Sequence, residues 1–134
     1  EVCNLYRKLN FEFESIIDNT AFIANNVTLN IGVQILTRCI LQSGVTIGED
    51  SIINTGSIIE HDTIIGKRNH IAPGCIISGG VHISDDVHIG AGAIISQGIR
   101  IGKDSVIGSG SSIVRDVPPC SKILPAKLRL TTLK

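Results

Sequence analysis

Aliphatic residues recur at every sixth position of the chain, from Ile17 to Ile113, without an interruption. The series has seventeen members, of which fifteen are Ile and two are Leu. An amphipathic helix repeats about every 3.6 residues and a half-buried strand alternates about every 2, so neither produces strict sixes. A fixed internal period of this kind is typical of a solenoid, in which each repeat packs on its neighbours.

A second series lies four residues after each aliphatic position and consists mostly of small or β-branched residues, such as Val33, Cys39 and Ser57. Gly, Asp and Asn gather between the two series, in segments such as "IGED", "IGKD" and "IAPG". These residues favour tight turns, while Ile and Val favour extended backbone. The pattern therefore predicts many short strands separated by turns.

The repeat resembles that of the hexapeptide family of left-handed β-helix acyltransferases. The resemblance implies an all-β, left-handed parallel β-helix, in which each hexad is a strand and a corner and both series point inward. Three hexads close a triangular rung of 18 residues, so seventeen hexads predict five to six rungs. We expect a short helix and linker over residues 1–14, the β-helix over residues 15–118, and a tail over residues 119–134.

A period of 18 residues also predicts which outward side chains stack. The residue before each aliphatic position falls into one of three columns, and one column is apolar over five rungs: Phe22, Ile40, Ile58, Ile76 and Ile94. The other two columns mix polar and apolar residues. Because an exposed apolar stripe of that length marks an interface, we predict a homo-oligomer joined along this face, and the resemblance makes it a homotrimer.

The segment from Asn54 through "EHD" to "HIAPG" narrows the resemblance. It is similar to the C-terminal domain of the sialic acid O-acetyltransferases and UDP-4-amino-sugar N-acetyltransferases, over roughly residues 12–127. That family transfers an acetyl group from acetyl-CoA to a sugar. The resemblance implies that His61 is the catalytic histidine, that Asp62 and Asn54 accompany it, and that His70 contacts acetyl-CoA.

Further positions follow from the same resemblance. It implies that the backbone amide of Gly79 faces the reaction, that Ala91 and Ser109 touch CoA, and that Lys103, Arg115 and Lys127 meet its phosphates. Full-length relatives carry an N-terminal nucleotide-sugar-binding domain, and residues 1–14 match only its last helix. The residues therefore leave the particular sugar open, as well as the choice between a hydroxyl and an amino acceptor.

Acyl transfer to a hydroxyl or amine needs a base that removes the acceptor's proton as it attacks the thioester. An imidazole suits this task because it can accept and release a proton near neutral pH. Asp62 would hold one tautomer of His61, and Gly79, 18 residues later, would lie one rung further at the same corner. No Ser or Cys stands beside a base of its own, so we expect direct transfer.

Composition and charge limit the classes of partner that the protein can bind. The formal net charge is zero, which argues against nucleic acid, and no apolar run is long enough to span a membrane. The four Cys residues are far apart in the sequence and form no C-x-x-C pair, so we expect reduced thiols, no zinc or redox motif, and a cytoplasmic location. Cys39 and Cys75 fall in the small inward series and are expected in the core.

Three alternatives stay open. A γ-class carbonic anhydrase shares the fold but needs three histidines on zinc; His70 and His88 share a column here, while the spacings of the histidines do not match that class. An inactive β-helix scaffold is the second alternative, which the set of Asn54, His61 and Asp62 disfavours. The third is an acyltransferase acting on an amino acid or an antibiotic, whose long interrupting loop is absent from these hexads.

Overall fold

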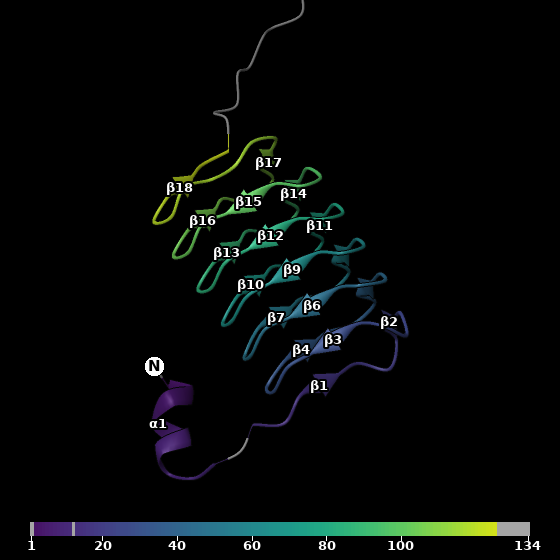
Figure 1. Ribbon diagram of the computed structural model, residues 1–134, viewed down its shortest axis with the longest axis vertical. Helices are drawn as coiled ribbons and strands as arrows, with labels where there is room; N and C mark the ends of the chain where they lie inside the picture. Colours follow the sequence, from purple (N-terminus) through teal and green to yellow (C-terminus); the bar gives the residue numbers. More distant parts are fainter. Residues whose placement is uncertain (1, 12, 126–134) are drawn as a thin grey trace, which may run out of the picture.

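The computed structural model describes residues 2–11 and 13–125, and it forms a parallel β-helix of about six turns with three parallel sheets and little helix (Figure 1). The three sheets are here called A, B and C. The chain contributes one short strand to each sheet in turn and then returns to sheet A for the next rung. The predicted all-β, parallel β-helical fold is confirmed.

Every hexad contributes one strand of two residues. Sheet A contains β1 (Ile16–Ile17), β4 (Gln34–Ile35), β7 (Ile52–Ile53), β10 (His70–Ile71), β13 (His88–Ile89), β16 (Val106–Ile107) and β18 (Lys122–Ile123). Sheet B contains β2 (Phe22–Ile23), β5 (Ile40–Leu41), β8 (Ile58–Ile59), β11 (Ile76–Ile77), β14 (Ile94–Ile95) and β17 (Ser112–Ile113). Sheet C contains β3 (Thr28–Leu29), β6 (Thr46–Ile47), β9 (Ile64–Ile65), β12 (His82–Ile83) and β15 (Arg100–Ile101).

The register of the sheets confirms the 18-residue columns. His70 pairs in parallel with Ile52 on one side and His88 on the other, and each rung repeats this spacing. Sheet B carries the predicted apolar column on its outer surface, where Phe22, Ile76 and Ile94 are 56%, 39% and 44% exposed.

The interior is filled by the aliphatic series, because every member from Ile35 to Ile107 is at most 1% exposed. The small series lies beside it, and most of its polar members form hydrogen bonds inside the prism, although the buried hydroxyl of Ser111 has no partner among the described residues. The hydroxyl of Ser57 donates to the carbonyl of Ala72 at 2.9 Å, and that of Thr63 donates to Ser78 at 3.0 Å. These bonds offset the free-energy cost of burying a hydroxyl, so Ser57 and Thr63 can occupy core positions.

The corners depend on one backbone conformation repeated every six residues. From Gly32 to Gly110, each corner has one residue with positive φ, which is either Gly or an Asp or Arg. Asp62, with a φ of 57°, occupies this position in its corner. Asp tolerates the left-handed region better than most side chains, so its place beside His61 is compatible with the turn.

The last rung is shorter than the others. Lys122 pairs with Val106 and Val117 pairs with Ile101, spacings of sixteen residues instead of eighteen. The carboxylate of Asp116 accepts the backbone N–H of Arg100 at 2.8 Å, in a position where a backbone carbonyl serves in the other rungs. Strand β18 lies in the segment expected to be a tail, so the boundary expected at residue 118 is not the end of the sheet.

The expected N-terminal helix is present as α1 (Val2–Lys8). Its Arg7 donates two hydrogen bonds to the carboxylate of Asp50, at 2.7 and 2.8 Å, and its guanidinium lies 5.2 Å from the ring centre of Phe13. These contacts attach the helix to the first rungs. No helix in the described ranges has the length and hydrophobicity that crossing a bilayer requires.

Candidate active site

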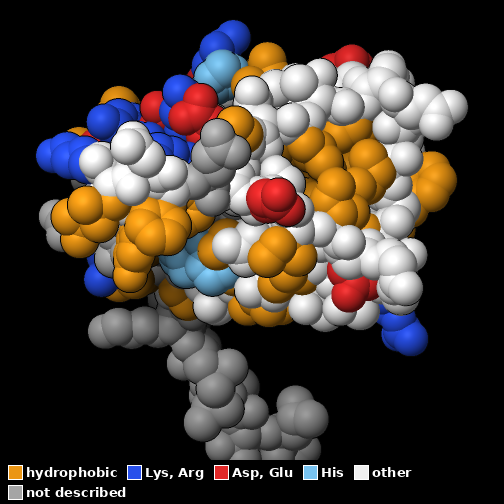
Figure 2. Space-filling model, turned by 90° about the horizontal axis from the view of Figure 1, so that it is seen from below, with side chains coloured by type: hydrophobic (Ala, Val, Ile, Leu, Met, Phe, Trp, Pro, Cys, Tyr) orange, Lys and Arg blue, Asp and Glu red, His pale blue; other side chains and the backbone are white. Residues whose placement is uncertain are grey.

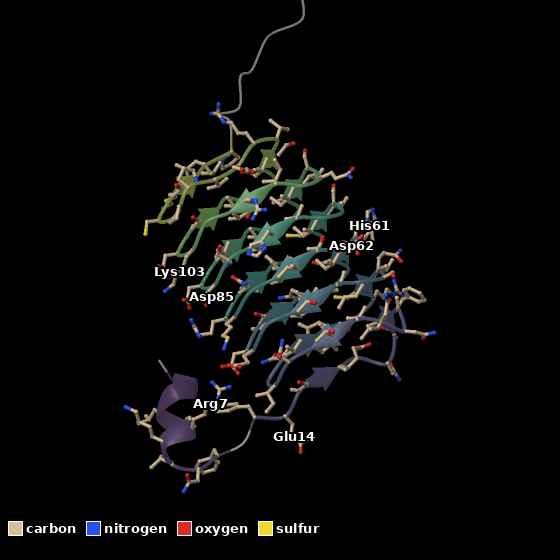
Figure 3. All side chains as sticks on the ribbon, viewed as in Figure 1. Arg7, Glu14, His61, Asp62, Asp85 and Lys103 are labelled. Atoms are coloured by element: carbon tan, nitrogen blue, oxygen red, sulfur yellow. The ribbon has the colours of Figure 1, made fainter. Side chains whose placement is uncertain are left out.

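The three corners of the prism separate the predicted site residues. We name each corner by the two sheets that it joins: the A–B corner holds Thr55, Ala91 and Ser109, the B–C corner holds His61 and Gly79, and the C–A corner holds Asp85 and Lys103. Figure 3 shows His61 and Asp62 on one edge of the prism and Asp85 and Lys103 on the opposite edge.

His61 and Asp62 form a pair at the B–C corner, between β8 and β9. Nδ1 of His61 lies 2.9 Å from Oδ2 of Asp62. A carboxylate accepts hydrogen bonds, so Nδ1 carries the proton of a neutral ring and Nε2 keeps its lone pair. The side chains are 56% and 74% exposed. An ion pair between side chains this exposed contributes little to the stability of the fold. Its effect is to orient the imidazole ring of His61.

The other nitrogen of His61 faces Gly79 on the next rung. A Cβ atom built on Gly79 would lie 2.5 Å from Nε2 and 2.7 Å from Cε1 of the ring. The two corners are joined by the N–H of Gly80, which donates to the carbonyl of His61 at 2.8 Å. The N–H of Gly79 makes no hydrogen bond to any part of the chain that the structure describes. The basic nitrogen of His61 therefore lies against the backbone of Gly79 on the next rung, as the 18-residue spacing predicts.

Asn54 and His70 come together at the other edge of sheet B. Asn54 follows β7, and its Nδ2 lies 3.3 Å from Nε2 of His70 on β10. His88, on β13, contacts the opposite side of the His70 ring, with ring centres 5.0 Å apart and an interplanar angle of 69°. His88 is exposed, and its spacing of 18 from His70 places the two rings in the same column, as the sequence predicts.

Sheet B lies between these two groups. Ala91 and Ser109 are exposed on successive rungs of the A–B corner, where the N–H of Gly110 donates to the carbonyl of Ala91 at 2.8 Å. They share that corner with Asn54 and Thr55, whereas His61 and Gly79 lie at the B–C corner. One chain therefore supplies two half-sites along the two edges of the same apolar face.

The cations expected at CoA phosphates have different locations. Arg115 is exposed at the B–C corner, near the C-terminal end of the column that contains His61. Lys103 lies at the C–A corner, where its Nζ is 3.7 Å from Asp86 and 3.9 Å from Asp104. Arg68 also binds Asp86 and lowers the pKa of that carboxyl. Lys127 is outside the described residues. Of the two expected cations that lie in the described residues, Arg115 is the one at the corner that also holds His61 and Gly79.

The thiols of Cys39 and Cys75 lie in the core, as the sequence predicts. Cys39 and Cys75 are buried and unbridged, and burial raises the pKa of both thiols. His82 lies on sheet C. Within the described ranges, no three side chains of His, Cys, Asp or Glu are close enough together to hold a metal ion.

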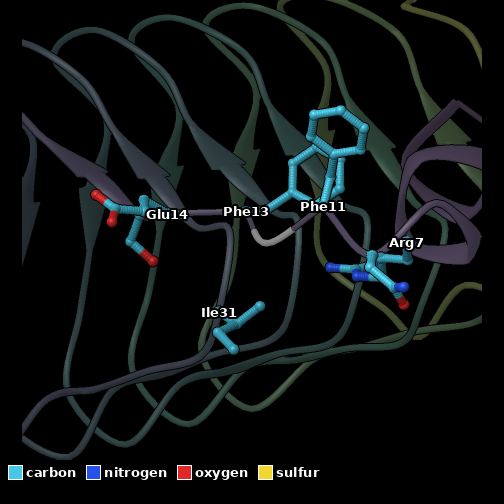
Figure 4. A pocket seen from close by; sticks show the side chains of 7 residues that line it. Arg7, Phe11, Phe13, Glu14 and Ile31 are labelled. Atoms are coloured by element: carbon cyan, nitrogen blue, oxygen red, sulfur yellow. The ribbon is translucent and has the colours of Figure 1, made fainter.

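A hollow of about 690 Å³ lies between α1 and the first rung, away from His61 (Figure 4). Arg7, Phe11, Phe13, Glu14 and Ile31 are among its lining residues. Ile31 belongs to the C–A corner, so this hollow does not adjoin the B–C corner that holds His61. The single chain thus presents its candidate catalytic residues on an exposed edge.

Comparison with known proteins agrees with this geometry. Residues 44–79 and 80–115 match the sequence profile of a family described as bacterial transferase hexapeptide (six repeats). No curated protein matches the chain significantly.

Several solved structures are similar. A perosamine N-acetyltransferase from Caulobacter crescentus, in complex with CoA and GDP-perosamine, is 29% identical, with a TM-score of 0.90 over 97% of this chain and 63% of that one. The acetyltransferase domain of PglB from Neisseria gonorrhoeae, in complex with acetyl coenzyme A, is 26% identical, with a TM-score of 0.89 over 94% and 62%. WeeI from Acinetobacter baumannii is 26% identical, with a TM-score of 0.79 over 90% and 59%. The chain spans about three fifths of the length of these proteins.

Proposed function

Because the chain belongs to the bacterial transferase hexapeptide family, we propose that it is an acetyltransferase that moves an acetyl group from acetyl-CoA to a sugar. Similarity to the perosamine N-acetyltransferase bound to GDP-perosamine favours a nucleotide-linked amino sugar over a sialic acid. The observation that carries the proposal is the arrangement of His61, whose Nδ1 faces Asp62 and whose Nε2 lies beside the backbone of Gly79.

The geometry supports a direct transfer. Nε2 of His61 takes the proton of the acceptor's amino or hydroxyl group as that group attacks the thioester carbonyl. Asp62 holds the ring and favours the imidazolium that forms. The N–H of Gly79 donates to the oxyanion. Collapse of the tetrahedral intermediate breaks the C–S bond, and the CoA sulfur leaves with the proton that His61 releases.

A homotrimer would complete the site. The apolar column of Phe22, Ile40, Ile58, Ile76 and Ile94 lies between the two half-sites, so packing these faces around a threefold axis places the A–B corner of one chain near the B–C corner of the next. His70, Ala91 and Ser109 of one subunit would then hold acetyl-CoA against His61 and Gly79 of its neighbour. Arg115, on the same side of the seam as His61, would meet a CoA phosphate.

The N-terminal end fits the proposed attachment of a nucleotide-sugar-binding domain. Seen from that end, hydrophobic side chains gather on the open rung of the prism and beside α1 (Figure 2). Leu5, Leu9, Phe11, Ile17 and Ile31 are each at least 50% exposed. Such a domain would cover these residues and present the sugar. The free thiols of Cys39 and Cys75 fit the proposed cytoplasmic location.

A substrate screen tests the proposed function. Thiol release from acetyl-CoA should rise above the rate of simple hydrolysis with nucleotide-linked 4-amino sugars, and less with sialic acids. The acceptors are supplied at millimolar concentrations, so that transfer is detected even when the affinity for the sugar is low. Acetylated sugar identified by mass spectrometry confirms transfer. Thiol release that no acceptor raises would contradict the proposal.

Replacing Gly79 by alanine should lower turnover about a hundredfold, the typical contribution of one oxyanion donor or general base. The added Cβ would meet the ring of His61 at 2.5 Å, so the imidazole must move from its position. The stability should change little, because the group that must move is the end of an exposed side chain. Thermal unfolding and kcat measure the two effects.

Gln97→Ala is the matched control, since Gln97 is exposed on the same corner one rung beyond Gly79. It should retain the kcat of the parent protein. If Gly79→Ala also turned over normally, the contact between Gly79 and His61 would have no part in the reaction.

A further inference from the structure

Asn54 has only one possible orientation of its side-chain amide. Its Oδ1 accepts the backbone N–H of Thr55 at 2.7 Å. A backbone N–H is always a donor, so the atom facing it is the amide oxygen and the NH₂ group points the other way. The backbone of Asn54 is fixed as well, because its N–H donates to Ile71 and its carbonyl accepts from Ser57.

The orientation of Asn54 determines the proton position on His70. The NH₂ group can only donate, and it lies 3.3 Å from Nε2 of His70. That nitrogen must therefore be an acceptor with no proton, which leaves the proton of the neutral ring on Nδ1. Nδ1 makes no hydrogen bond to the described part of the chain, so it is an available N–H donor.

The surroundings of His70 disfavour a second proton. Burial lowers the pKa of His70, and the neighbouring His88 lowers it further. On the other side of His70 lie Ile52 of β7 and the neutral Asn54 that follows this strand. His88 is therefore the titratable group that faces His70 from the adjacent strands. As pH falls, the ring therefore stays neutral below the range in which an ordinary histidine becomes charged.

We infer that Asn54 and His88 are positioning residues, which hold His70 as the neutral tautomer with its proton on Nδ1. Asn54 acts through a hydrogen bond to Nε2, and His88 acts by covering the ring. The next step rests on the proposed function. The N–H on Nδ1 of His70 is directed to an acceptor group of acetyl-CoA, and Asn54 itself touches no reacting atom. This inference gives Asn54 an indirect role, in place of the direct catalytic role that the resemblance implies.

The variant Asn54→Asp separates this role from a structural one. An aspartate still accepts the N–H of Thr55, but it presents an oxygen instead of an NH₂ group to His70. Nitrogen-15 NMR of histidine-labelled protein reads the proton position directly and does not require activity. In the parent protein, Nδ1 of His70 should be protonated and Nε2 unprotonated. In Asn54→Asp this pattern should reverse, and the ring should titrate at higher pH.

The variant His88→Phe provides a second test of the inference. A phenyl ring keeps the cover over His70 but removes the titratable neighbour, so the tautomer should persist while the titration moves to higher pH. His82→Phe, on sheet C, should leave both properties unchanged. A proton on Nε2 in the parent protein, or an unchanged His70 spectrum in Asn54→Asp, would overturn the inference. Neither result depends on whether acetyl-CoA is the substrate.

Discussion

His61→Ala should lower kcat at least about a hundredfold, the usual contribution of a general base, while the β-helix stays folded. The side chain is 56% exposed and packs no core residue, so its removal leaves no cavity. In the proposed mechanism, the variant loses the acceptor of the substrate proton beside Gly79. Steady-state thiol release, with circular dichroism to monitor the fold, measures the change.

His82→Ala is the matched control for this variant. It also removes an imidazole from the surface of the solenoid, but from sheet C and away from the B–C corner. Its kcat should stay within about twofold of the parent value, as expected for a side chain outside the site. Near-normal turnover in His61→Ala would remove His61 from the mechanism.

Ile76→Asp should dissociate the predicted homotrimer and abolish most activity. Ile76 lies in the middle of the apolar column of sheet B, and its side chain is 39% exposed in the single chain. Three aspartates brought together at an apolar interface would be desolvated and mutually repulsive, which costs several kcal/mol. Light scattering should give the mass of a trimer for the parent protein and of a monomer for the variant.

Val106→Asp provides the comparison, because Val106 is 38% exposed but lies on sheet A. It should keep the trimeric mass. A monomeric parent protein, or a monomeric Ile76→Asp variant with full activity, would show that the site is complete in one chain.

Mixing of two inactive variants tests the shared site more directly. If His61 and His70 act from different chains, refolding His61→Ala with His70→Ala should restore about a quarter of the activity, the share of sites that random mixing leaves intact in a cyclic trimer. Sites contained in one chain would gain nothing from mixing.

The sequence carried unusually direct information about this fold. Strict sixes placed the strands from β1 to β17, because a solenoid pairs only neighbouring rungs and the interior accepts one large aliphatic side chain per hexad. The same spacing predicted that Gly79 lies beside His61 and that Phe22 to Ile94 form one exposed column. Only the last rung departed from it, since two residues are missing there and Asp116 supplies the acceptor.

The interactions of the side chains depended on the tertiary structure. The family resemblance assigned Asn54, His61 and His70 to one site, whereas within a single chain the fold divides them between two edges of sheet B. It also showed that the exposed ring of His88 contacts that of His70, and it placed Lys103 among carboxylates at the C–A corner. Periodicity determines which rung and face a residue occupies, because backbone pairing repeats identically. Which side chains meet, and in which protonation state, depends on rotamers, hydrogen bonds and burial that a one-dimensional period does not contain.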